Sequence, residues 1–276
     1  MSGTLYLVPT PIGNLGDLSP RCRETLEAAD FIAAEDTRVS LKLLNHLGIK
    51  KQLVSYYEHN KRESGPRIVE RLLAGETCAL VTDAGTPAIS DPGEDLVRLC
   101  AEQGVPVCAV CGPCAAITAL AVSGLPTARF TFEGFLSVNK KSRRAHLDSL
   151  RGETRTMLFY EAPHKLAVTL ADLREAFGGD RRISLCRELT KLHEEVQRLT
   201  LDEAVRLYEE VQPRGEYVLV LAGAEPKQDE GASEEAALAK ALKYLEAGMS
   251  KKDAARLAAE ETGFPKNALY EKIKNN

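Results

Sequence analysis

The chain has 276 residues, which is longer than one ordinary domain and favours two. Its 44% apolar and 28% charged residues are close to the globular average and exclude disordered and collagen-like classes. No run of about 18 apolar residues is present to span a membrane, and the first residues lack the basic region of a secretory signal. We therefore expect a cytoplasmic protein whose seven cysteines are reduced thiols. With a net charge of −4, nucleic-acid binding would depend on local basic patches.

The first part of the chain alternates strand-like and helical patterns. Apolar runs typical of strands occur at 4–9, 31–34, 77–82 and 105–110. One helical pattern starts at Pro20, and four more occupy 38–47, 66–74, 92–103 and 115–122. Strands that alternate with helices predict an α/β domain with a largely parallel sheet, which we place at residues 1–115.

The second part repeats this alternation as an independent α/β domain at 116–224. We expect strands at 129–134, 156–160, 183–188 and 216–222, with helices at 142–150, 164–177 and 201–211. Residues 225–233 are polar and acidic with almost nothing to bury, and they predict a linker. The last segment, 234–276, has three short helical patterns at 234–247, 250–261 and 265–274, and their spacing is typical of a helix-turn-helix.

Four loops rich in Gly and Pro follow predicted strands, at 9–14, 83–87, 112–113 and 161–164. In open α/β sheets, ligands bind outside the carboxyl ends of the strands. Small residues there let the backbone approach a ligand, and prolines stiffen the rim. The four loops together predict a nucleotide-sized crevice. None contains G-x-G-x-x-G or G-x-x-x-x-G-K-[ST], which argues against a Rossmann dinucleotide site and a P-loop.

Charged residues directly after the second strand allow two interpretations. Glu35, Asp36 and Arg38 follow it at the start of a predicted helix. A capping carboxylate suits a helix N-terminus, but an arginine is unfavourable there. The pattern therefore favours a structural cap and a functional site about equally.

Cysteines and basic residues suggest two further sites. Cys108, Cys111 and Cys114 have the C-x₂-C-x₂-C spacing of some metal sites. Since side chains alternate along a strand, we favour structural thiols and expect no metal. The densest basic cluster is at 140–144, and the loop at 56–62 is aromatic and basic. Either is a place for an RNA phosphate to bind, or an ordinary solvated surface.

Six motifs together resemble the tetrapyrrole methylase superfamily, and within it the members that methylate ribosomal RNA. They are LVPTPIGNLGD at 7–17, AEDTR at 34–38, VTDAGTPAISDPG at 81–93, EGF at 133–135, YEAPHK at 160–165 and RELTK at 187–191. The resemblance extends over residues 4–223, and the last segment resembles the helix-turn-helix extension of many such members. The chain departs from the usual pattern at Cys111 and Cys114, where Pro- and Ser-like residues are commoner.

The resemblance implies S-adenosylmethionine as cofactor, held in a crevice between two α/β domains. It also implies 2′-O-methylation of a cytidine ribose in the decoding centre of bacterial 16S rRNA, with the 30S subunit as partner, in a homodimer. Carried over by position, it implies cofactor contacts at Pro11, Ala84, Gly85, Thr86, Ile89, Cys114, Ala115, Tyr160, Glu161, Glu188, Glu216, Tyr217 and Val218. It implies RNA contacts at Arg21, Arg38, His59, Asn60, Lys140, Lys141, Arg143, Arg144, Lys251, Lys252 and Lys266.

The expected chemistry is an in-line methyl transfer to a hydroxyl, which requires alignment and exclusion of water. The hydroxyl must lose its proton, so a carboxylate or a cation near the oxygen helps. From their expected place at the mouth of the crevice, we predict Glu35 or Asp36 as the base and Arg38 or Lys165 as the group that steadies the oxygen.

Two rival functions stay open at this point. A tetrapyrrole C-methyltransferase of the same fold usually has Gly-x-Gly-Pro-Gly-Asp in its first loop, where this chain has Pro-Thr-Pro-Ile-Gly-Asn. A non-catalytic RNA-binding factor is the other alternative, supported by the helix-turn-helix pattern. Sequence-specific binding to DNA is disfavoured, because the segment at 266–270 is only mildly basic.

Overall fold

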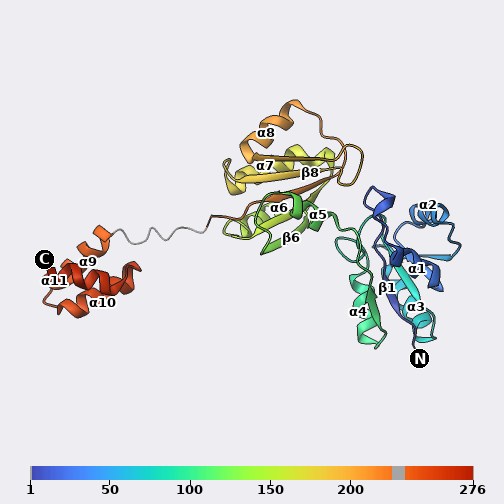
Figure 1. The fold of residues 1–276 in the computed structure, drawn as a ribbon, viewed down its shortest axis with the longest axis horizontal. Coiled ribbons are helices and arrows are strands. Elements are labelled where there is room, and N and C mark those ends of the chain that lie inside the picture. Colours follow the sequence, from blue (N-terminus) through green and yellow to red (C-terminus); the bar gives the residue numbers. More distant parts are fainter. Residues whose placement is uncertain (1, 226–233, 276) are drawn as a thin grey trace. The chain divides into compact units, whose positions relative to one another are not determined.

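The computed structural model describes residues 2–225 and 234–275, and the chain divides into two compact units, Met1–Gly223 and Ala224–Asn276 (Figure 1). The larger unit holds two five-stranded sheets with helices packed on them. Of the predicted linker at 225–233, only Glu225 is among the described residues. The predicted boundary between two α/β domains at 115/116 stays a prediction.

The first sheet is entirely parallel, in the order β3-β2-β4-β1-β5. Its strands are β1 (Leu5–Leu7), β2 (Phe31–Ala34), β3 (Gln52–Ser55), β4 (Cys78–Val81) and β5 (Val107–Ala109). The intervening helices are α1 (Pro20–Ala28), α2 (Thr37–Leu47), α3 (Lys61–Leu73) and α4 (Glu94–Glu102), with a short 3-10 turn, η1 (Leu15–Asp17), after β1. The largely parallel sheet predicted for this part of the chain is therefore present.

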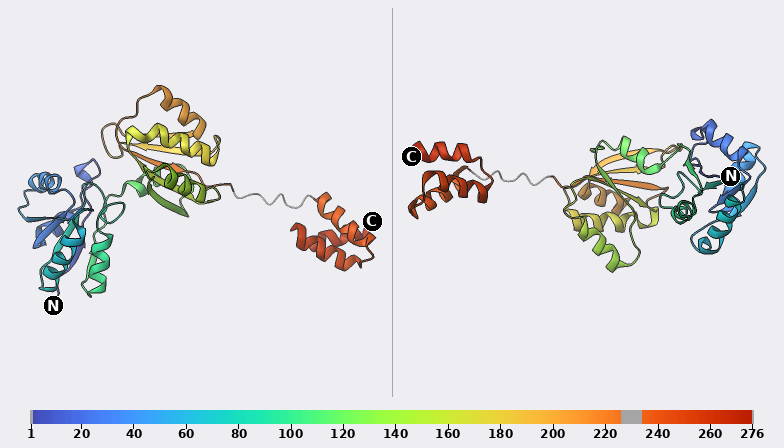
Figure 2. Two further views of the ribbon diagram at one scale, coloured as in Figure 1. Left: turned by 180° about the vertical axis from the view of Figure 1, so that it is seen from behind. Right: turned by 90° about the horizontal axis from the view of Figure 1, so that it is seen from below.

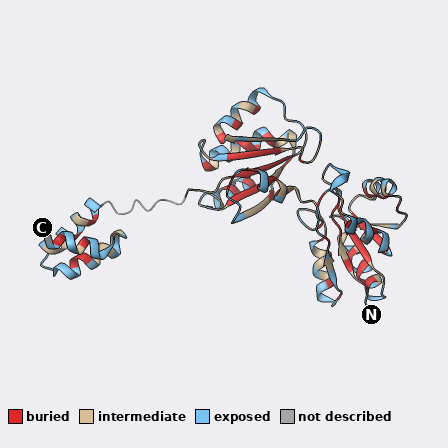
Figure 3. Ribbon diagram, viewed as in Figure 1, coloured by how far each residue is buried: buried red, intermediate tan, exposed pale blue. Residues whose placement is uncertain are grey.

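Both faces of this sheet are buried, as the nearly continuous apolar strands require. Phe31 and Ala33 of β2 pack on one face with α3 and α4, whereas Ile32 and Ala34 pack on the other with α1 and α2. The strands β2 and β4 are buried throughout, whereas β3 and β5 at the edges of the sheet are partly exposed; Figure 3 shows exposed residues on the outer helix surfaces. This arrangement leaves the strand ends, and not the faces, free to bind a ligand.

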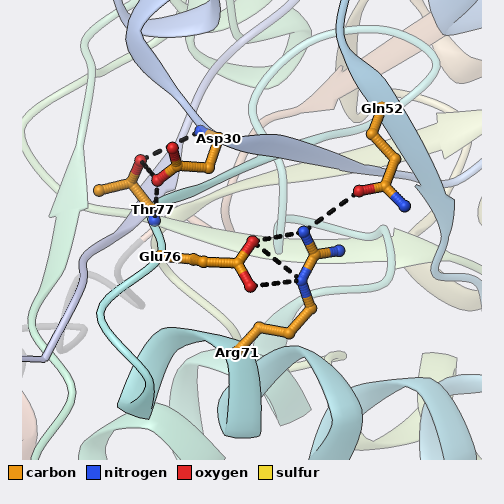
Figure 4. Close-up of polar contacts among 5 residues, drawn as sticks. All are labelled: Asp30, Gln52, Arg71, Glu76 and Thr77. Atoms are coloured by element: carbon orange, nitrogen blue, oxygen red, sulfur yellow. Dashed lines mark hydrogen bonds and ion pairs between the residues drawn. The ribbon is translucent and has the colours of Figure 1, made fainter.

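Polar contacts fasten the amino ends of β2, β3 and β4 (Figure 4). The Asp30 carboxylate accepts hydrogen bonds from the Thr77 backbone N–H at 2.7 Å and its hydroxyl at 2.8 Å. The Arg71 guanidinium pairs with Glu76, donates to the Gln52 side chain at 3.2 Å, and stacks 3.5 Å above the centre of the Phe31 ring. These contacts join α3 to three strands at the edge opposite their carboxyl ends.

The second sheet is mixed, in the order β6-β7-β10-β8-β9. Only β6 and β7 run parallel, and the other pairs are antiparallel. Its strands are β6 (Phe130–Phe135), β7 (Thr156–Glu161), β8 (Arg182–Arg187), β9 (Glu195–Thr200) and β10 (Tyr217–Leu221). Its helices are α5 (Ala115–Val122), α6 (Lys140–Ser149), η2 (Pro163–Lys165), α7 (Leu166–Phe177) and α8 (Leu201–Glu210), shown from two further sides in Figure 2.

Helix α5 packs on one face of this sheet, against Leu158, Cys186 and Val218, whereas α6, α7 and α8 cover the other face.

Three elements differ from the sequence predictions. The strands β3 and β9 were not predicted, because their residues are only partly buried and carry polar side chains. Helix α3 begins at Lys61, five residues before the predicted start, and includes Pro66 in its second turn.

The second unit is a cluster of three helices, α9 (Glu234–Glu246), α10 (Lys251–Thr262) and α11 (Lys266–Asn275). Ser250 caps α10, and Gly263 ends it in a left-handed conformation with φ of 72°. Ala237, Ala241, Ala258, Leu269 and Ile273 are buried between the helices. The predicted helix-turn-helix pattern is therefore formed by α10, the turn at 263–265 and α11.

Candidate active site

A cavity of about 280 Å³ is lined by loops and strand ends from both sheets of the larger unit. The first sheet contributes the loops after β1, β2 and β4, and the second contributes β6, β7, β8 and β10 with their adjoining loops. Its lining residues are Ile12, Glu35, Asp83, Ala84, Gly85, Thr86, Ile89, Ser90, Asp91, Cys114, Ala115, Phe135, Tyr160, Glu161, Cys186, Leu189, Lys191, Glu216, Tyr217 and Val218. The predicted crevice therefore exists within this unit.

Backbone contacts hold the first-sheet loops together. Thr10 and Gly85 form a two-way bridge, with each backbone N–H donating to the other residue's carbonyl at 2.9 and 3.0 Å. The Thr86 hydroxyl donates to the Pro113 carbonyl at 2.8 Å. A side chain at Gly85, whose φ is 87°, would lie 3.3 Å from Ile12. Three of the Gly/Pro loops singled out in the sequence are thus tied into one rim.

Unusual backbone conformations are concentrated at this cavity. Among the described residues, positive φ values outside glycine occur only at Ala88, Ser90, Glu188 and Thr190. The first two lie in the loop after β4, and the other two lie in the loop after β8. Such conformations are costly for residues with a Cβ, and they persist where the surrounding structure imposes them, often at functional sites.

Three carboxylates line the first-sheet side of the cavity. The Thr82 hydroxyl donates to Glu35 Oε2 at 2.6 Å. Burial and then the charge of Glu35 raise the pKa of Asp91 to about 6, and the same two causes raise the pKa of Asp83. Asp83 and Asp91 were not among the predicted site residues. Both belong to the motif at 81–93, whose Gly and Pro residues predict a turn but give no sign that its two acids line a cavity.

An aromatic cluster forms part of the second-sheet side. The Tyr160 ring meets Phe132 and Phe135 edge-on, with centroids 5.1 and 5.5 Å apart. Its hydroxyl accepts a hydrogen bond from the Ala116 backbone N–H at 3.2 Å, at the start of α5. Burial raises the pKa of Tyr160 to about 12. Tyr160 therefore stays neutral and fixes the position of α5 beside the cavity.

Lys191 forms the charged end of this wall and was also missed in the sequence. Its ammonium contacts Glu188 and Glu216, each at 2.8 Å. The hydrogen bond from Lys191 lowers the pKa of Glu188. Glu188 also accepts from the Glu216 backbone N–H at 3.0 Å. Glu188 itself does not line the cavity, but it anchors two residues that do.

Most of the predicted cofactor residues lie at this cavity. The exceptions are Glu188 and Pro11, which lines a neighbouring hollow together with Asp83. The contacts of these residues with a cofactor stay predictions.

The four predicted catalytic residues are not brought together. Glu35 lines the cavity. Asp36 accepts from the Arg38 backbone N–H at 2.8 Å, caps α2 and pairs with the Arg38 guanidinium at 2.6 Å. This pairing lowers the pKa of Asp36 to about 2, and the Arg38 side chain is 86% exposed. Lys165 lines a different hollow beside α6 and α7. Of the four, Glu35 alone lines the cavity.

The predicted RNA-binding residues are spread over both units. Lys140, Arg143 and Arg144 line the hollow that also contains Lys165, and Lys141 is exposed on the same helix. Arg143 is buried, with its guanidinium bonded to Asp172 and Thr169. The remaining predicted RNA contacts are exposed at Arg21, His59, Lys251, Lys252 and Lys266, and partly buried at Asn60, which accepts from the Tyr57 backbone N–H.

All seven cysteines are free thiols, and Cys114 lines the cavity. Within residues 2–225 and 234–275, no cluster of three or more His, Cys, Asp or Glu side chains is arranged to hold a metal ion. In the same part of the chain, no helix is both long and apolar enough to span a bilayer.

Comparison with solved structures supports the fold. A diphthine synthase has a TM-score of 0.60 at 16% identity, covering 80% of this chain and 90% of that one. The methyltransferase CobJ has a TM-score of 0.60 at 18% identity, covering 81% and 95%. A uroporphyrin-III C-methyltransferase from Thermus thermophilus, complexed with S-adenosylhomocysteine, has a TM-score of 0.54 at 18% identity, covering 80% and 97%.

Sequence comparisons are more specific. The family model of tetrapyrrole (corrin/porphyrin) methylases matches residues 4–205, and that of the RsmI C-terminal HTH domain matches 232–273. The ribosomal RNA small subunit methyltransferase I of Synechocystis is 47% identical, and that of Pseudomonas aeruginosa is 48% identical. Each alignment covers 98% of this chain and 96% of the relative. The chain belongs to the tetrapyrrole methylase family and, within it, to the ribosomal RNA small subunit methyltransferases I.

Proposed function

We propose that this chain uses S-adenosylmethionine to methylate the 2′-hydroxyl of a cytidine ribose in the decoding centre of bacterial 16S rRNA, in the cytoplasm. The observation that carries the proposal is the cavity where loops of both sheets meet, in a chain whose relatives at 47–48% identity are named for ribosomal RNA methylation. The 30S subunit is the proposed partner.

The lining of the cavity fits such a cofactor. Ala84, Gly85 and Ala115 present backbone without bulky side chains, and Leu189 with Tyr160 offers an apolar surface for a purine. The carboxylates on the opposite wall suit the cationic groups of the ligand. When bound, S-adenosylmethionine supplies an electrophilic methyl group.

The residues of the chain then have to orient the acceptor, exclude water and remove a proton. Glu35 is the proposed proton acceptor, because it lines the cavity and the Thr82 hydroxyl holds its Oε2 atom. Asp36 is a weaker candidate, since its carboxylate is bonded to Arg38 and to the backbone of α2. A base whose pKa is lowered to about 2 is also a poor proton acceptor.

A homodimer is the proposed assembly. Leu15 is 50% exposed and Val39 is 37% exposed, and both line the same hollow beside α2. Leu43, one turn after Val39 on α2, lines the same hollow. Clustered exposed apolar side chains are typical of protein interfaces. Sedimentation equilibrium tests this: we expect a dimeric wild type and a monomeric Val39→Glu variant, and a monomeric wild type would refute the proposal.

The first experiment is transfer of labelled methyl from S-adenosylmethionine to 30S subunits that lack their own decoding-centre ribose methylation, followed by nucleoside analysis. The expected product is 2′-O-methylcytidine. No transfer, despite measured cofactor binding, would refute the proposal. Tetrapyrroles would then be tested next, because several proteins of similar fold are named for methylating them.

A further inference from the structure

A second hollow, of about 440 Å³, lies beside α6 and α7 on the larger unit. The loop after β6 contributes Ser137 and Val138, and the turn after β7 contributes His164 and Lys165. It shares no lining residue with the cavity described above.

The charges around this hollow do not balance. Each of its three carboxylates is held by an arginine of the same hollow: Asp148 by Arg151 at 2.8 Å, Asp172 by Arg143, and Glu175 by Arg144 at 3.1 Å. Lys140 and Lys165 remain, and neither forms an ion pair with any residue of the described part of the chain. A chain with net charge −4 therefore presents a local positive site here.

The hollow also has an apolar rim. Val138 is 80% exposed, and Val168, on α7, is 63% exposed. Both line the hollow with Leu147 and Ala176. Two free ammonium groups beside exposed apolar side chains match a nucleotide, which carries a negative phosphate and a flat apolar base face.

Short segments connect this hollow to the methylation cavity. Phe135 lines the cavity and Val138 lines the hollow, and three residues of chain span at most about 10 Å. Glu161 and His164 repeat this arrangement after β7. A buried hydrogen-bond chain also joins the two sites, from Arg143 through the Thr169 hydroxyl to the Glu161 carboxylate.

We propose that the hollow binds one nucleotide of the RNA strand next to the nucleotide that is methylated. Lys140 and Lys165 each contact one of the two phosphodiesters that flank this nucleotide, and Val138 and Val168 contact its base. This inference rests on the proposed function, and it assigns to Lys165 a role in positioning RNA and not in the chemical step.

The test measures the dissociation constant of unmethylated 30S subunits over a range of KCl concentrations, with the full-length chain saturated with S-adenosylhomocysteine. Each lost contact with a single-stranded phosphate reduces the slope of log K against log salt by about 0.7. At 0.15 M salt this corresponds to affinity weaker by about fourfold for Lys140→Ala or Lys165→Ala, and by about fourteenfold for the double variant.

Lys50→Ala is the matched control. Lys50 is exposed and follows α2 at the amino edge of the first sheet, so its replacement leaves slope and affinity unchanged. Val168→Asp weakens binding, whereas Val168→Leu retains it. In methyl-transfer assays the double variant raises KM for 30S subunits and keeps kcat within about twofold.

An unchanged slope and KM in the double variant, with wild-type transfer intact, would overturn this inference alone. The hollow would then be open to a different occupant, such as an acidic peptide. A double variant that loses kcat at saturating 30S would also overturn it, because that result would indicate a role for Lys165 in methyl transfer itself. Absence of methyl transfer by the wild type would instead refute the proposed function.

Discussion

Replacement of Thr169 by valine should destabilise the larger unit by removing one buried hydroxyl. Thr169 lies on α7 with 0% of its surface exposed. Its hydroxyl donates to Glu161 Oε2 and accepts from the Arg143 guanidinium at 2.8 Å. Valine has nearly the same shape but cannot take either role, so the change isolates the hydrogen bonds from packing.

The size of the effect follows from what is left behind. Glu161 is 4% exposed, and Ala162 N–H still donates to its other oxygen at 2.9 Å. A buried polar group without a partner costs about 1–3 kcal/mol, and more where it is charged. With two charged partners affected, we expect a loss of about 3 kcal/mol. For a unit of this size, that lowers the melting temperature by roughly 6–12 °C.

Calorimetry of the full chain without ligand, with Thr169→Ser as the matched control, checks this. Serine keeps the hydroxyl and should melt within a few degrees of the wild type. If Thr169→Val melts with Thr169→Ser, the chain from Arg143 to Glu161 contributes little to stability. The cavity and the hollow beside α6 and α7 would then be neighbours without an energetic coupling through these hydrogen bonds.

Four further predictions concern the cavity. Because the pKa of Asp91 is raised to about 6 from 3.8, its ionisation opposes folding, and its own contribution to stability falls as pH rises from about 4 through 6. Urea titrations should therefore show Asp91→Asn more stable than wild type above pH 6, with the difference gone at pH 4. Tyr160→Phe loses the contact with Ala116 N–H, and urea titrations should show the free energy of unfolding lowered by about 1 kcal/mol. Saturating S-adenosylhomocysteine should slow alkylation of Cys114, which lines the cavity, and leave the exposed Cys111 unprotected, as peptide mass mapping would show. Glu35→Gln should lower kcat of methyl transfer by about 10²–10⁴-fold with cofactor affinity within about threefold, and an unchanged kcat would exclude Glu35 as the base.

Much of the fold was predictable because buried strands carry a strong local signal. Helix α5 has the predicted bounds of 115–122, and β2 has those of 31–34. The strands β3 and β9 each lie at an edge of a sheet and carry polar residues such as Gln52 and Arg198, so no run of apolar residues marks them. Pro66 predicted a helix start, but in the structure α3 begins at Lys61 and Pro66 lies in its second turn.

The site was predictable as a set of loops but not as a set of contacts. Gly and Pro marked the loops after β1 and β4, and the cavity lies there. Side chains that are neighbours in sequence nevertheless have different surroundings. Glu35 lines the cavity, whereas Asp36 and Arg38 bond to each other at the start of α2. Lys191 could not be assigned from the sequence, because its partners Glu188 and Glu216 come together only through pairing of β8 with β10.

The distribution of strain and support in the first sheet explains how such a site can persist. At the amino edge, Asp30 binds Thr77 and Arg71 binds Glu76, so the strands are fixed at the ends opposite the cavity. At the carboxyl edge, the loop after β4 contains Ala88 and Ser90 in left-handed conformations. Each such residue costs about 1–3 kcal/mol, and it persists only where rigid neighbours impose it. Loosening the amino edge, for example by Asp30→Ala, should therefore weaken ligand binding at the opposite end of the same strands.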